Sequence, residues 1–208
     1  MTLQSVPGGS FGRNLDFILV DKNGYLNKNG NTVQHAIFQA RHLFQDMTMD
    51  YTGGVSMNLT NTNIGGYQVS LGRTYVNTEV YTGLLGSGVP VNNSNVILPL
   101  NRHVDVGTNS GSTPSVIADV VFLPTEYEIR GSRSHSPGHE TIASQAHFIY
   151  YNNDNSRIKR GRTGSGHRWW TASTSINPNA FCNITPGGVV GSGNADADIG
   201  TPPCFAIG

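Results

Sequence analysis

Two apolar stretches near the carboxyl terminus frame the part of this sequence that decides the fold. Residues 168–173 read Arg-Trp-Trp-Thr-Ala-Ser, and residues 203–207 read Pro-Cys-Phe-Ala-Ile. The segment between them is rich in Thr, Ser, Asn, Gly and Asp and holds almost no long side chains. Strand-forming ends around a polar, short-chained segment are typical of a binding surface displayed on a scaffold. We therefore expect residues 168–208 to form a terminal display segment.

The composition of the whole chain favours a loop-rich fold that contains β-strands. Only 12% of the 208 residues are charged and 37% are hydrophobic, whereas Gly (26) and Asn (21), which are turn residues, are abundant. The length fits one domain. We predict an α+β fold with short antiparallel strands and one or two helices, formed by residues 15–208 after an arm or linker at residues 1–14.

Local patterns predict where the elements lie. Residues 70–84 place apolar side chains near one helical face, with Ser70 as the N-cap and Gly86 as the stop. Residues 126–131 favour a short helix or a turn. Strands are expected at residues 15–20, 33–38, 116–124, 148–151, 158, 167–170, 181–184, 188–190 and 204–207, with the first two paired and a turn at 152–155.

Charge and hydropathy argue against several partners. The net charge is zero, so no global field attracts nucleic acid or an anionic membrane. One basic run, residues 157–162, is best interpreted as a solvated hairpin loop, and no segment is apolar enough to insert into a membrane. Residues 1–11 lack the features of a signal peptide, so a protein working outside a cell would leave by lysis or a dedicated assembly.

The two cysteines, Cys182 and Cys204, allow two interpretations. They can be small buried hydrophobic residues on neighbouring strands, or they can form a disulfide. Two cysteines do not make a zinc site.

Catalytic and metal chemistry find little support. His139-Glu140, near His135, lacks the second histidine that a zinc-protease helix requires. The carboxylates of Glu126 and Glu128 are best explained by structural hydrogen bonding, because nothing else indicates a sugar-cleaving cleft. The sequence predicts no enzyme.

Asp196 and Asp198 are the only candidates for a calcium site. Their alternating spacing resembles a calcium loop, but no acidic residue closes it as a bidentate ligand would. Two acids make a weak site, so we expect no metal and no cofactor, with calcium as the one weak alternative.

Three blocks together resemble one protein family. They are residues 57–67 (Met-Asn-Leu-Thr-Asn-Thr-Asn-Ile-Gly-Gly-Tyr), continued by Ser70, Arg73 and Tyr75, residues 121–131 (Val-Phe-Leu-Pro-Thr-Glu-Tyr-Glu-Ile-Arg-Gly), and residues 168–173 with the closing residues 200–207. In this order they are similar to domains of unassigned function from gut bacteria and their phages. The resemblance covers roughly residues 15–208.

The resemblance implies a C-type-lectin-like fold in a phage tail tip or an adhesin. Some similar domains are variable proteins of diversity-generating retroelements, in which adenines of a terminal repeat are randomised. This sequence departs from the family pattern at residues 171–173, where the family has Leu-Arg-Ser-Pro, and has Thr-Pro-Pro in place of Val-Arg-Pro near the end. Both departures fall in the segment that diversification would change.

The composition of residues 171–208 offers a separate check on diversification. Randomising the adenines of Asn codons cannot produce Lys, Gln, Glu, Met or Trp. The segment contains none of these five types, which make up 19 of the 208 residues, so about three or four would be expected in it. A Gly-rich loop would also lack long side chains, so the absence is suggestive only.

We therefore expect a non-enzymatic receptor-binding protein. The favoured setting is a phage tail or fibre tip, on a virion, that binds a bacterial surface protein or glycan. The alternative is a bacterial surface adhesin of the same fold. A tip protein is expected to be a homo-oligomer, because several weak sites bind together with high avidity. The predicted ligand-binding residues are Trp170, Thr174, Ser175, Asn177, Asn179, Asn183, Thr185, Ser192, Asn194, Asp196 and Asp198.

Overall fold

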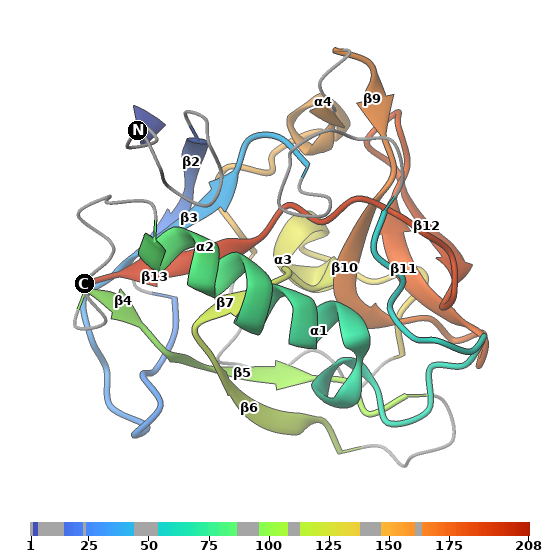
Figure 1. Ribbon diagram of the computed structural model, residues 1–208, viewed down its shortest axis with the longest axis horizontal. Coiled ribbons are helices and arrows are strands. Elements are labelled where there is room, and N and C mark those ends of the chain that lie inside the picture. Colours follow the sequence, from blue (N-terminus) through green and yellow to red (C-terminus); the bar gives the residue numbers. More distant parts are fainter. Residues whose placement is uncertain are drawn as a thin grey trace.

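The predicted α+β class with short antiparallel strands is confirmed. A computed structural model describes residues 2–3, 15–22, 24–43, 54–86, 96–107, 113–137, 147–160 and 164–208. Within these ranges, every pair of named strands is antiparallel and the helices are few and short. Figure 1 shows the longest helical run lying across one face of a sheet, with a second, smaller sheet at one end of the molecule.

The carboxyl-terminal strand lies inside the main sheet. In the order β1-β2-β3-β13-β4, β13 pairs with β3 and β4, and it pairs with β7 as well. The bounds are β1 Thr2–Leu3, β2 Leu15–Lys22, β3 Ala36–Ala40, β4 Ile97–Leu98, β7 Val121–Phe122 and β13 Cys204–Ile207. The apolar terminus is therefore buried by strands from both halves of the sequence, and the expected pairing of the first two strands is confirmed.

The expected helix at residues 70–84 is present and extends to Gly86. It consists of α1 (Leu71–Tyr75), a π-helical turn η2 (Val76–Val80) and α2 (Tyr81–Gly86), and it follows the 3₁₀ turn η1 (Tyr67–Val69). The Ser70 side chain accepts a hydrogen bond from the Arg73 N–H, as an N-cap does. Val76, Val80 and Leu84 are fully buried against the sheet.

The second sheet contains most of the terminal segment. Its order is β10 (Trp169–Thr174), β11 (Ala180–Ile184) and β12 (Val190–Asn194). Smaller ladders pair β5 (Leu100–Val104) with β6 (Ser115–Asp119) and β8 (Lys159–Arg160) with β9 (Gly166–His167). The remaining helices are α3 (Glu126–Arg130) and α4 (Asp154–Arg157).

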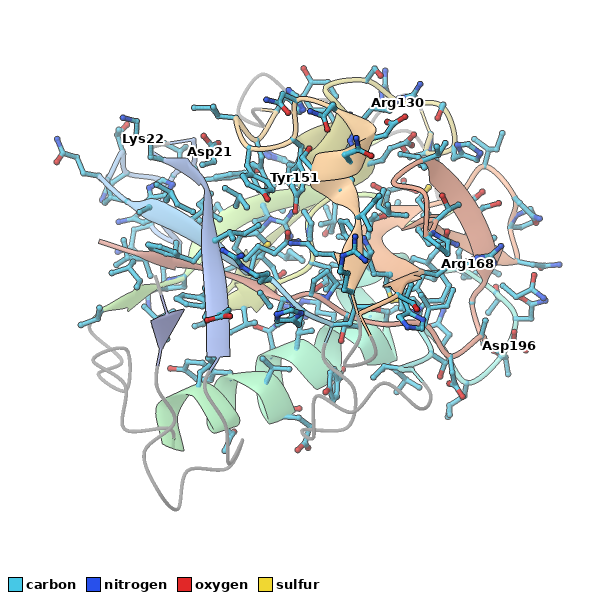
Figure 2. The ribbon with its side chains drawn as sticks, turned by 90° about the horizontal axis from the view of Figure 1, so that it is seen from above. Asp21, Lys22, Arg130, Tyr151, Arg168 and Asp196 are labelled. Atoms are coloured by element: carbon cyan, nitrogen blue, oxygen red, sulfur yellow. The ribbon has the colours of Figure 1, made fainter. Side chains whose placement is uncertain are left out.

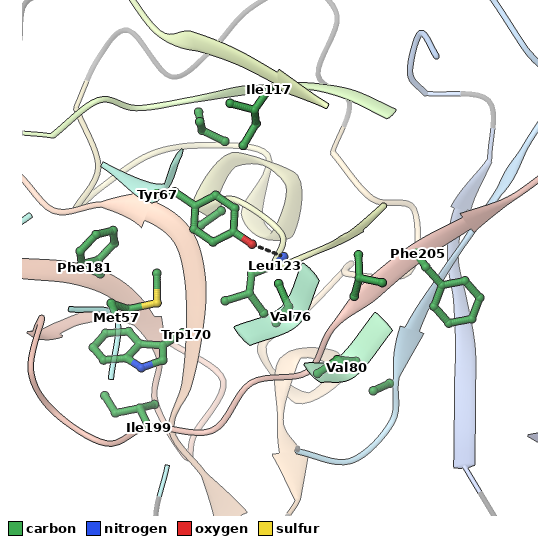
Figure 3. Close-up of a cluster of buried hydrophobic side chains, with 14 of the residues drawn as sticks. Met57, Tyr67, Val76, Val80, Ile117, Leu123, Trp170, Phe181, Ile199 and Phe205 are labelled. Carbon is green, nitrogen blue, oxygen red and sulfur yellow. Dashed lines mark hydrogen bonds between the residues drawn. The ribbon is translucent and has the colours of Figure 1, made fainter. Parts of the chain in front are cut away.

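The two adjacent tryptophans enter two different core clusters. Neighbouring residues on a strand point to opposite faces, so Trp170 packs with Met57, Phe181 and Ile199, whereas Trp169 packs with Ile184. Figure 3 shows the first cluster, in which the Trp170 and Phe181 rings pack edge to face with their centroids 6.5 Å apart. The tryptophan pair thus joins the small sheet to both halves of the core.

Three local expectations are wrong. Residues 116–124 form two strands and not one, since β6 ends at Asp119, whose buried carboxylate binds Arg73. The run is also not buried throughout, because Val116 is 55% exposed. Residues 148–158 are not two strands joined by a turn, because residues 148–151 and Ile158 form no strand and Asn153 caps the helix α4 through Ser156. The basic run at 157–162 is not wholly solvated, since Arg157 and Lys159 are buried; residues 161–162 lie outside the described part.

The predicted arm at residues 1–14 is described only in part. Thr2 and Leu3 pair with Asp16 and Leu15 of β2. The other residues of this range lie outside those that the structure describes.

Candidate functional site

The terminal segment consists of a buried backbone frame and an exposed outer face. Strand β10 and strand β11 are buried at every position, whereas β12, at the edge of the three-stranded sheet, alternates between covered and exposed residues. The turn at residues 176–179 and the segment after Ser192 carry most of the exposed side chains. We call residues 176–179, 192–198 and the adjoining loop 58–64 the terminal face.

Asn63 fastens the turn of the terminal face from behind. Its side-chain amide donates to the backbone carbonyls of Ser175, Asn177 and Ala180 at 2.9, 3.0 and 3.0 Å, and its N–H donates to the Pro178 carbonyl at 2.8 Å. Asn63 is fully buried. One side chain therefore binds three carbonyls around the turn, two of which, those of Asn177 and Ala180, also accept from the N–H groups of Ala180 and Ser175.

The glycines near Asn63 allow the loop to approach other backbone closely. A Cβ on Gly66 would lie 1.9 Å from the Asp105 carbonyl oxygen, and one on Gly107 would lie 2.1 Å from the Asn63 carbonyl oxygen. Both glycines have positive φ angles, 65° and 93°. The sequence block 57–67 thus acts as a rigid support for the terminal face.

A second set of backbone contacts holds the far side of the terminal face. The Asn58 N–H donates to the Ala195 carbonyl at 2.9 Å, and the Ala195 N–H donates to the Asn61 side-chain oxygen at 3.2 Å. Val55 pairs with Ile199, and the Val55 carbonyl accepts a 2.6 Å bond from the Trp170 indole N–H. The backbone of residues 195–199 is therefore fixed by contacts outside the segment.

The predicted ligand-binding residues separate into two groups. Six are exposed on the terminal face: Asn177, Asn179, Ser192, Asn194, Asp196 and Asp198. Thr185 is half-exposed but lies in the turn at the other end of β11. The remaining four, Trp170, Thr174, Ser175 and Asn183, are at most 2% exposed.

The predicted ligand-binding role of Trp170 requires an exposed ring, which the structure does not provide. Trp169 and Trp170 are both completely buried, because the second sheet packs against protein on both faces. Trp170 therefore stabilises the frame and cannot contact a ligand on the surface. Thr174 is likewise internal, since its hydroxyl donates to the Asp105 carboxylate.

Asn183 is buried in an unusual way. Neither atom of its side-chain amide has a hydrogen-bond partner among the described residues. It lies beneath Gly191 and Gly193, and a Cβ on Gly193 would come within 2.7 Å of its Nδ2 atom. Only glycine backbone therefore separates this amide from the outer surface of β12.

The residues predicted from the sequence do not include three exposed apolar side chains of the terminal face. Leu59, Ile64 and Ile176 are 83%, 64% and 65% exposed. The only sequence signal is their position in turns rich in Asn, Thr, Gly and Pro, where core side chains are rare. The terminal face combines short polar groups with apolar ones.

Glu126 organises the loop beside the terminal face. Its carboxylate accepts from the N–H groups of Ser134 and Ser136, at 2.7 Å each, and from the Ser134 hydroxyl at 2.9 Å. Burial raises the pKa of the Glu126 carboxyl, but the bonds from Ser136 and Ser134 outweigh burial and hold the pKa below its usual value. The structural role expected for this carboxylate is confirmed.

Glu128 also has a structural role. It completes a capping box with Thr125 and forms a fully buried ion pair with Arg102 at 2.6 Å. The Tyr25 hydroxyl donates to its other oxygen. These groups face one another inside the core, so they are not available to a substrate.

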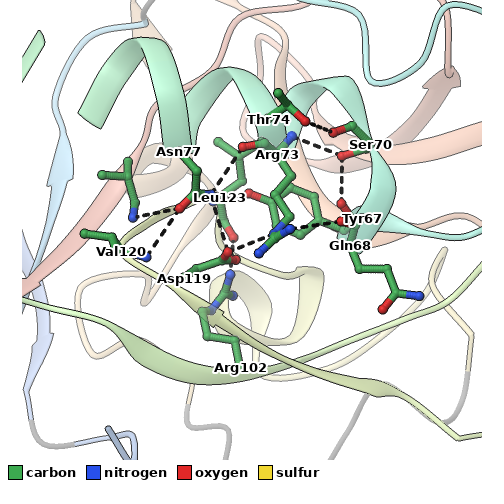
Figure 4. A network of polar contacts seen from close by, with 11 residues as sticks. Tyr67, Gln68, Ser70, Arg73, Thr74, Asn77, Arg102, Asp119, Val120 and Leu123 are labelled. Atoms are coloured by element: carbon green, nitrogen blue, oxygen red, sulfur yellow. Dashed lines mark hydrogen bonds and ion pairs between the residues drawn. The ribbon is translucent and has the colours of Figure 1, made fainter. Parts of the chain in front are cut away.

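A further polar network joins the helix to β6. Arg73 Nε donates to Asp119 at 2.8 Å, and the Asn77 amide donates to the same oxygen at 3.3 Å (Figure 4). Asn77 lies in the π-helical turn, whose wider spacing places its amide opposite the strand. This network is structural as well.

No metal centre is formed by the described residues. They contain no group of three His, Cys, Asp or Glu side chains placed to hold an ion, and Asp196 and Asp198 form no such group. His139 and Glu140 lie outside the described part. None of the helices in the described ranges has the length and apolar composition that crossing a bilayer requires.

Both cysteines are free thiols and buried. The expectation of two small buried residues is confirmed, and the alternative of a disulfide is wrong. They do not lie on neighbouring strands, since Cys182 is in β11 and Cys204 is in β13 of the other sheet.

Comparison with known proteins identifies the family. A family model described as a domain of unknown function, DUF6273, matches residues 43–208. The chain belongs to this family. No curated protein and no solved structure matches the chain. The DUF6273 region includes the whole terminal face and its support, whereas β2 and β3 precede it.

Proposed function

We propose that this protein is a non-enzymatic recognition module that binds a receptor through its terminal face. The proposal rests on one observation, which is that the backbone of the terminal segment is held by other residues while several of its exposed side chains are unpaired. Its backbone is held by Asn63, Asn58 and Val55, whereas the exposed side chains of Ser192, Asn194, Asp196 and Asp198 make no hydrogen bond or ion pair with described residues. Unpaired polar side chains on a fixed backbone are suited to binding another molecule.

The mixture of side chains on the terminal face supports binding rather than catalysis. Short Ser, Asn and Asp side chains provide adaptable hydrogen bonds, and Leu59, Ile64 and Ile176 provide apolar contact area. The strongly perturbed acids and bases belong to buried structural networks away from this face. A bacterial surface protein or glycan is the proposed ligand.

The proposed setting is a phage tail or fibre tip with a C-type-lectin-like fold, placed on the virion and assembled as a homo-oligomer. The blocks 57–67, 121–131 and 168–173 support this proposal by resemblance. A bacterial surface adhesin of the same fold is the second candidate. In either setting we propose that diversification acts on residues 171–208, and we expect its useful targets to be the exposed positions of that segment.

The experiment compares the protein with a triple variant, Asn194→Ala/Asp196→Ala/Asp198→Ala, in binding to cells of candidate hosts. The variant should lose most of its cell binding, because it removes three unpaired polar groups from the terminal face, while its melting temperature stays within a few degrees of the parent. Glu79→Ala, an exposed change on η2, is the matched control and should bind normally. Unchanged binding by the triple variant would contradict the proposal.

A further inference from the structure

The outer edge of β12 presents main-chain groups that no other described strand covers. β12 (Val190–Asn194) is the last strand of the second sheet, in the order β10-β11-β12. Figure 1 shows it on the outer side of that sheet. Asp196, two residues past its end, lies at the opposite end of the molecule from Asp21 and Lys22 (Figure 2). The edge of β12 is therefore at the periphery of the molecule.

The register of the β11–β12 ladder shows which residues of β12 point outward. The two strands pair without a shift over the whole of β12. Just beyond one end of the ladder, the Thr185 N–H donates to the Val189 carbonyl at 2.8 Å. Beyond the other end, the Ala195 N–H donates to the Asn179 carbonyl at 2.9 Å. Because hydrogen-bonded and non-hydrogen-bonded pairs alternate along an antiparallel ladder, the main-chain groups of residues 190, 192 and 194 point away from β11.

Two exposed residues supply free main-chain groups at this edge. Ser192 and Asn194 are exposed, whereas Val190 is only 5% exposed. Among the described residues, the N–H and carbonyl of Ser192 and the N–H of Asn194 have no hydrogen-bond partner. The Asn194 carbonyl accepts from the Ala197 N–H at 2.9 Å and keeps a second lone pair. Such a row of free donors and acceptors is a template for another strand.

The sequence of β12 lacks the features that commonly protect a sheet edge. Its residues, Val-Gly-Ser-Gly-Asn, include no charged side chain and no proline, and the ladder with β11 has no bulge. Five residues are an ordinary length for a strand. The edge of β12 is therefore open to pairing in its chemistry as well as in its position.

We propose that two copies of this chain associate through β12, with the two strands antiparallel about a twofold axis at Gly193. In this register Ser192 of each copy lies opposite Asn194 of the other. Each of these two pairs exchanges two main-chain hydrogen bonds, so the dimer gains about four. The three-stranded sheets of the two copies then form one continuous sheet.

A second copy fits this edge because the edge is complementary to itself. Each outward-facing residue offers one donor and one acceptor, and a twofold axis places the donors of one copy opposite the acceptors of the other. The paired residues carry no charge, so the two strands do not repel each other. Asp196 and Asp198, the nearest acids in the sequence, follow the paired segment in both copies.

The dimer specifies the interface of the homo-oligomer in the proposed function, but it forms whether or not the terminal face binds a receptor. Side chains of a strand stand roughly perpendicular to the sheet, so pairing at the edge leaves those of Ser192 and Asn194 accessible. Two terminal faces are then presented by one assembly, which raises avidity for a surface that carries many receptors.

Sedimentation velocity of the full chain, without any ligand, tests dimer formation. An interface of one strand pair buries less than about 1,200 Å², so the association should be weak. The sedimentation coefficient should rise from the monomer value towards the dimer value between roughly 10 µM and 1 mM. A chain that stays monomeric over this range overturns the proposal, whereas a failure of receptor binding alone does not affect it.

Ser192→Pro distinguishes the β12 edge from any other interface. The change removes an outward-facing N–H, and an edge strand tolerates proline where its N–H faces solvent. Because the dimer loses a hydrogen bond from each copy, its dissociation constant should rise at least about tenfold. Ser192→Ala, which keeps the main chain, is the matched control and should dimerise as the parent does. Equal dimerisation of Ser192→Pro and the parent rejects the interface.

Cross-linking decides the question if Ser192→Pro does not fold. In the proposed register the two copies of residue 192 lie about 8 Å apart, within reach of a short bismaleimide. Ser192→Cys should therefore cross-link into dimers, whereas Glu79→Cys, exposed on η2, should not. Cys182 and Cys204 are buried and should not react. Equal cross-linked fractions for the two variants would show that β12 is not the interface.

Discussion

At the scale of single residues, Lys159 is the most perturbed cation of the described chain. It is 2% exposed, its ammonium donates to the Ala40 carbonyl at 3.0 Å, and the Tyr151 ring centre lies 6.0 Å away. Burial lowers the pKa of Lys159 to about 7, Cys204 partly opposes this change, and Arg41 adds to it. The folded state therefore binds this proton more weakly than the unfolded chain does.

The sign of the effect on stability follows from this lowered pKa. Above 10.5, the ordinary pKa of lysine, both states are neutral at this site and the lysine has no cost. As the pH falls from 10.5 to about 7, the unfolded chain gains the proton first, so the folded state becomes relatively less stable. Below about pH 7 the cost is constant.

We predict that Lys159→Met will change the pH profile of stability. The stability of the variant relative to the parent should be highest at and below about pH 7 and should decline steadily as the pH rises to 10.5. Chemical denaturation at a series of pH values measures this difference. A stability difference that does not vary with pH would show that Lys159 has an ordinary pKa in the folded protein.

At the scale of elements, the terminal face depends on the loop that supports it. Asn63 belongs to the loop 58–64, yet its amide binds three carbonyls around the turn at 176–179. The stability of the turn is therefore a property of two elements more than a hundred residues apart.

We predict that Asn63→Ala will destabilise the protein by about 1–3 kcal/mol, because it removes a buried amide that donates to three carbonyls around the turn. Amide hydrogen exchange should accelerate at residues 175–180, and receptor binding should weaken. Thr60→Ala is the matched control, since Thr60 is exposed in the same loop. If both variants show the same exchange rates, Asn63 does not hold the turn.

Elements with local signals could be predicted from the sequence, and those without could not. Ser70 begins a helix whose N-cap is encoded within a few residues, since its side chain accepts from the Arg73 N–H; the residues after the predicted stop at Gly86 lie outside the described part. The helix α4 was missed because Asn153 and Ser156 also favour turns, and only their mutual hydrogen bonds distinguish the two. The bulge at Val20 has no local signal, because it depends on pairing with β3.

At the scale of the whole molecule, long-range pairing limited what could be predicted about the site. The apolar terminus was expected to form a strand, but its position between β3, β4 and β7 depends on strands far away in the sequence. Polar composition alone placed Thr174 and Asn183 on the surface, whereas both lie inside the second sheet. Burial in this segment follows the packing of the sheet and not the polarity of the residue.

Tolerance to replacement should differ between the exposed and the buried positions of the terminal segment. One library randomises the exposed positions 177, 179, 192, 194, 196 and 198, and a matched library randomises the buried positions 172, 173, 174, 180, 182 and 183. Most members of the first should fold, since exposed substitutions usually change stability by less than about 0.5 kcal/mol, whereas most members of the second should not. Protease resistance of the displayed chains measures the folded fraction. Equal folded fractions would mean that the terminal segment is not divided into a fixed frame and a replaceable face.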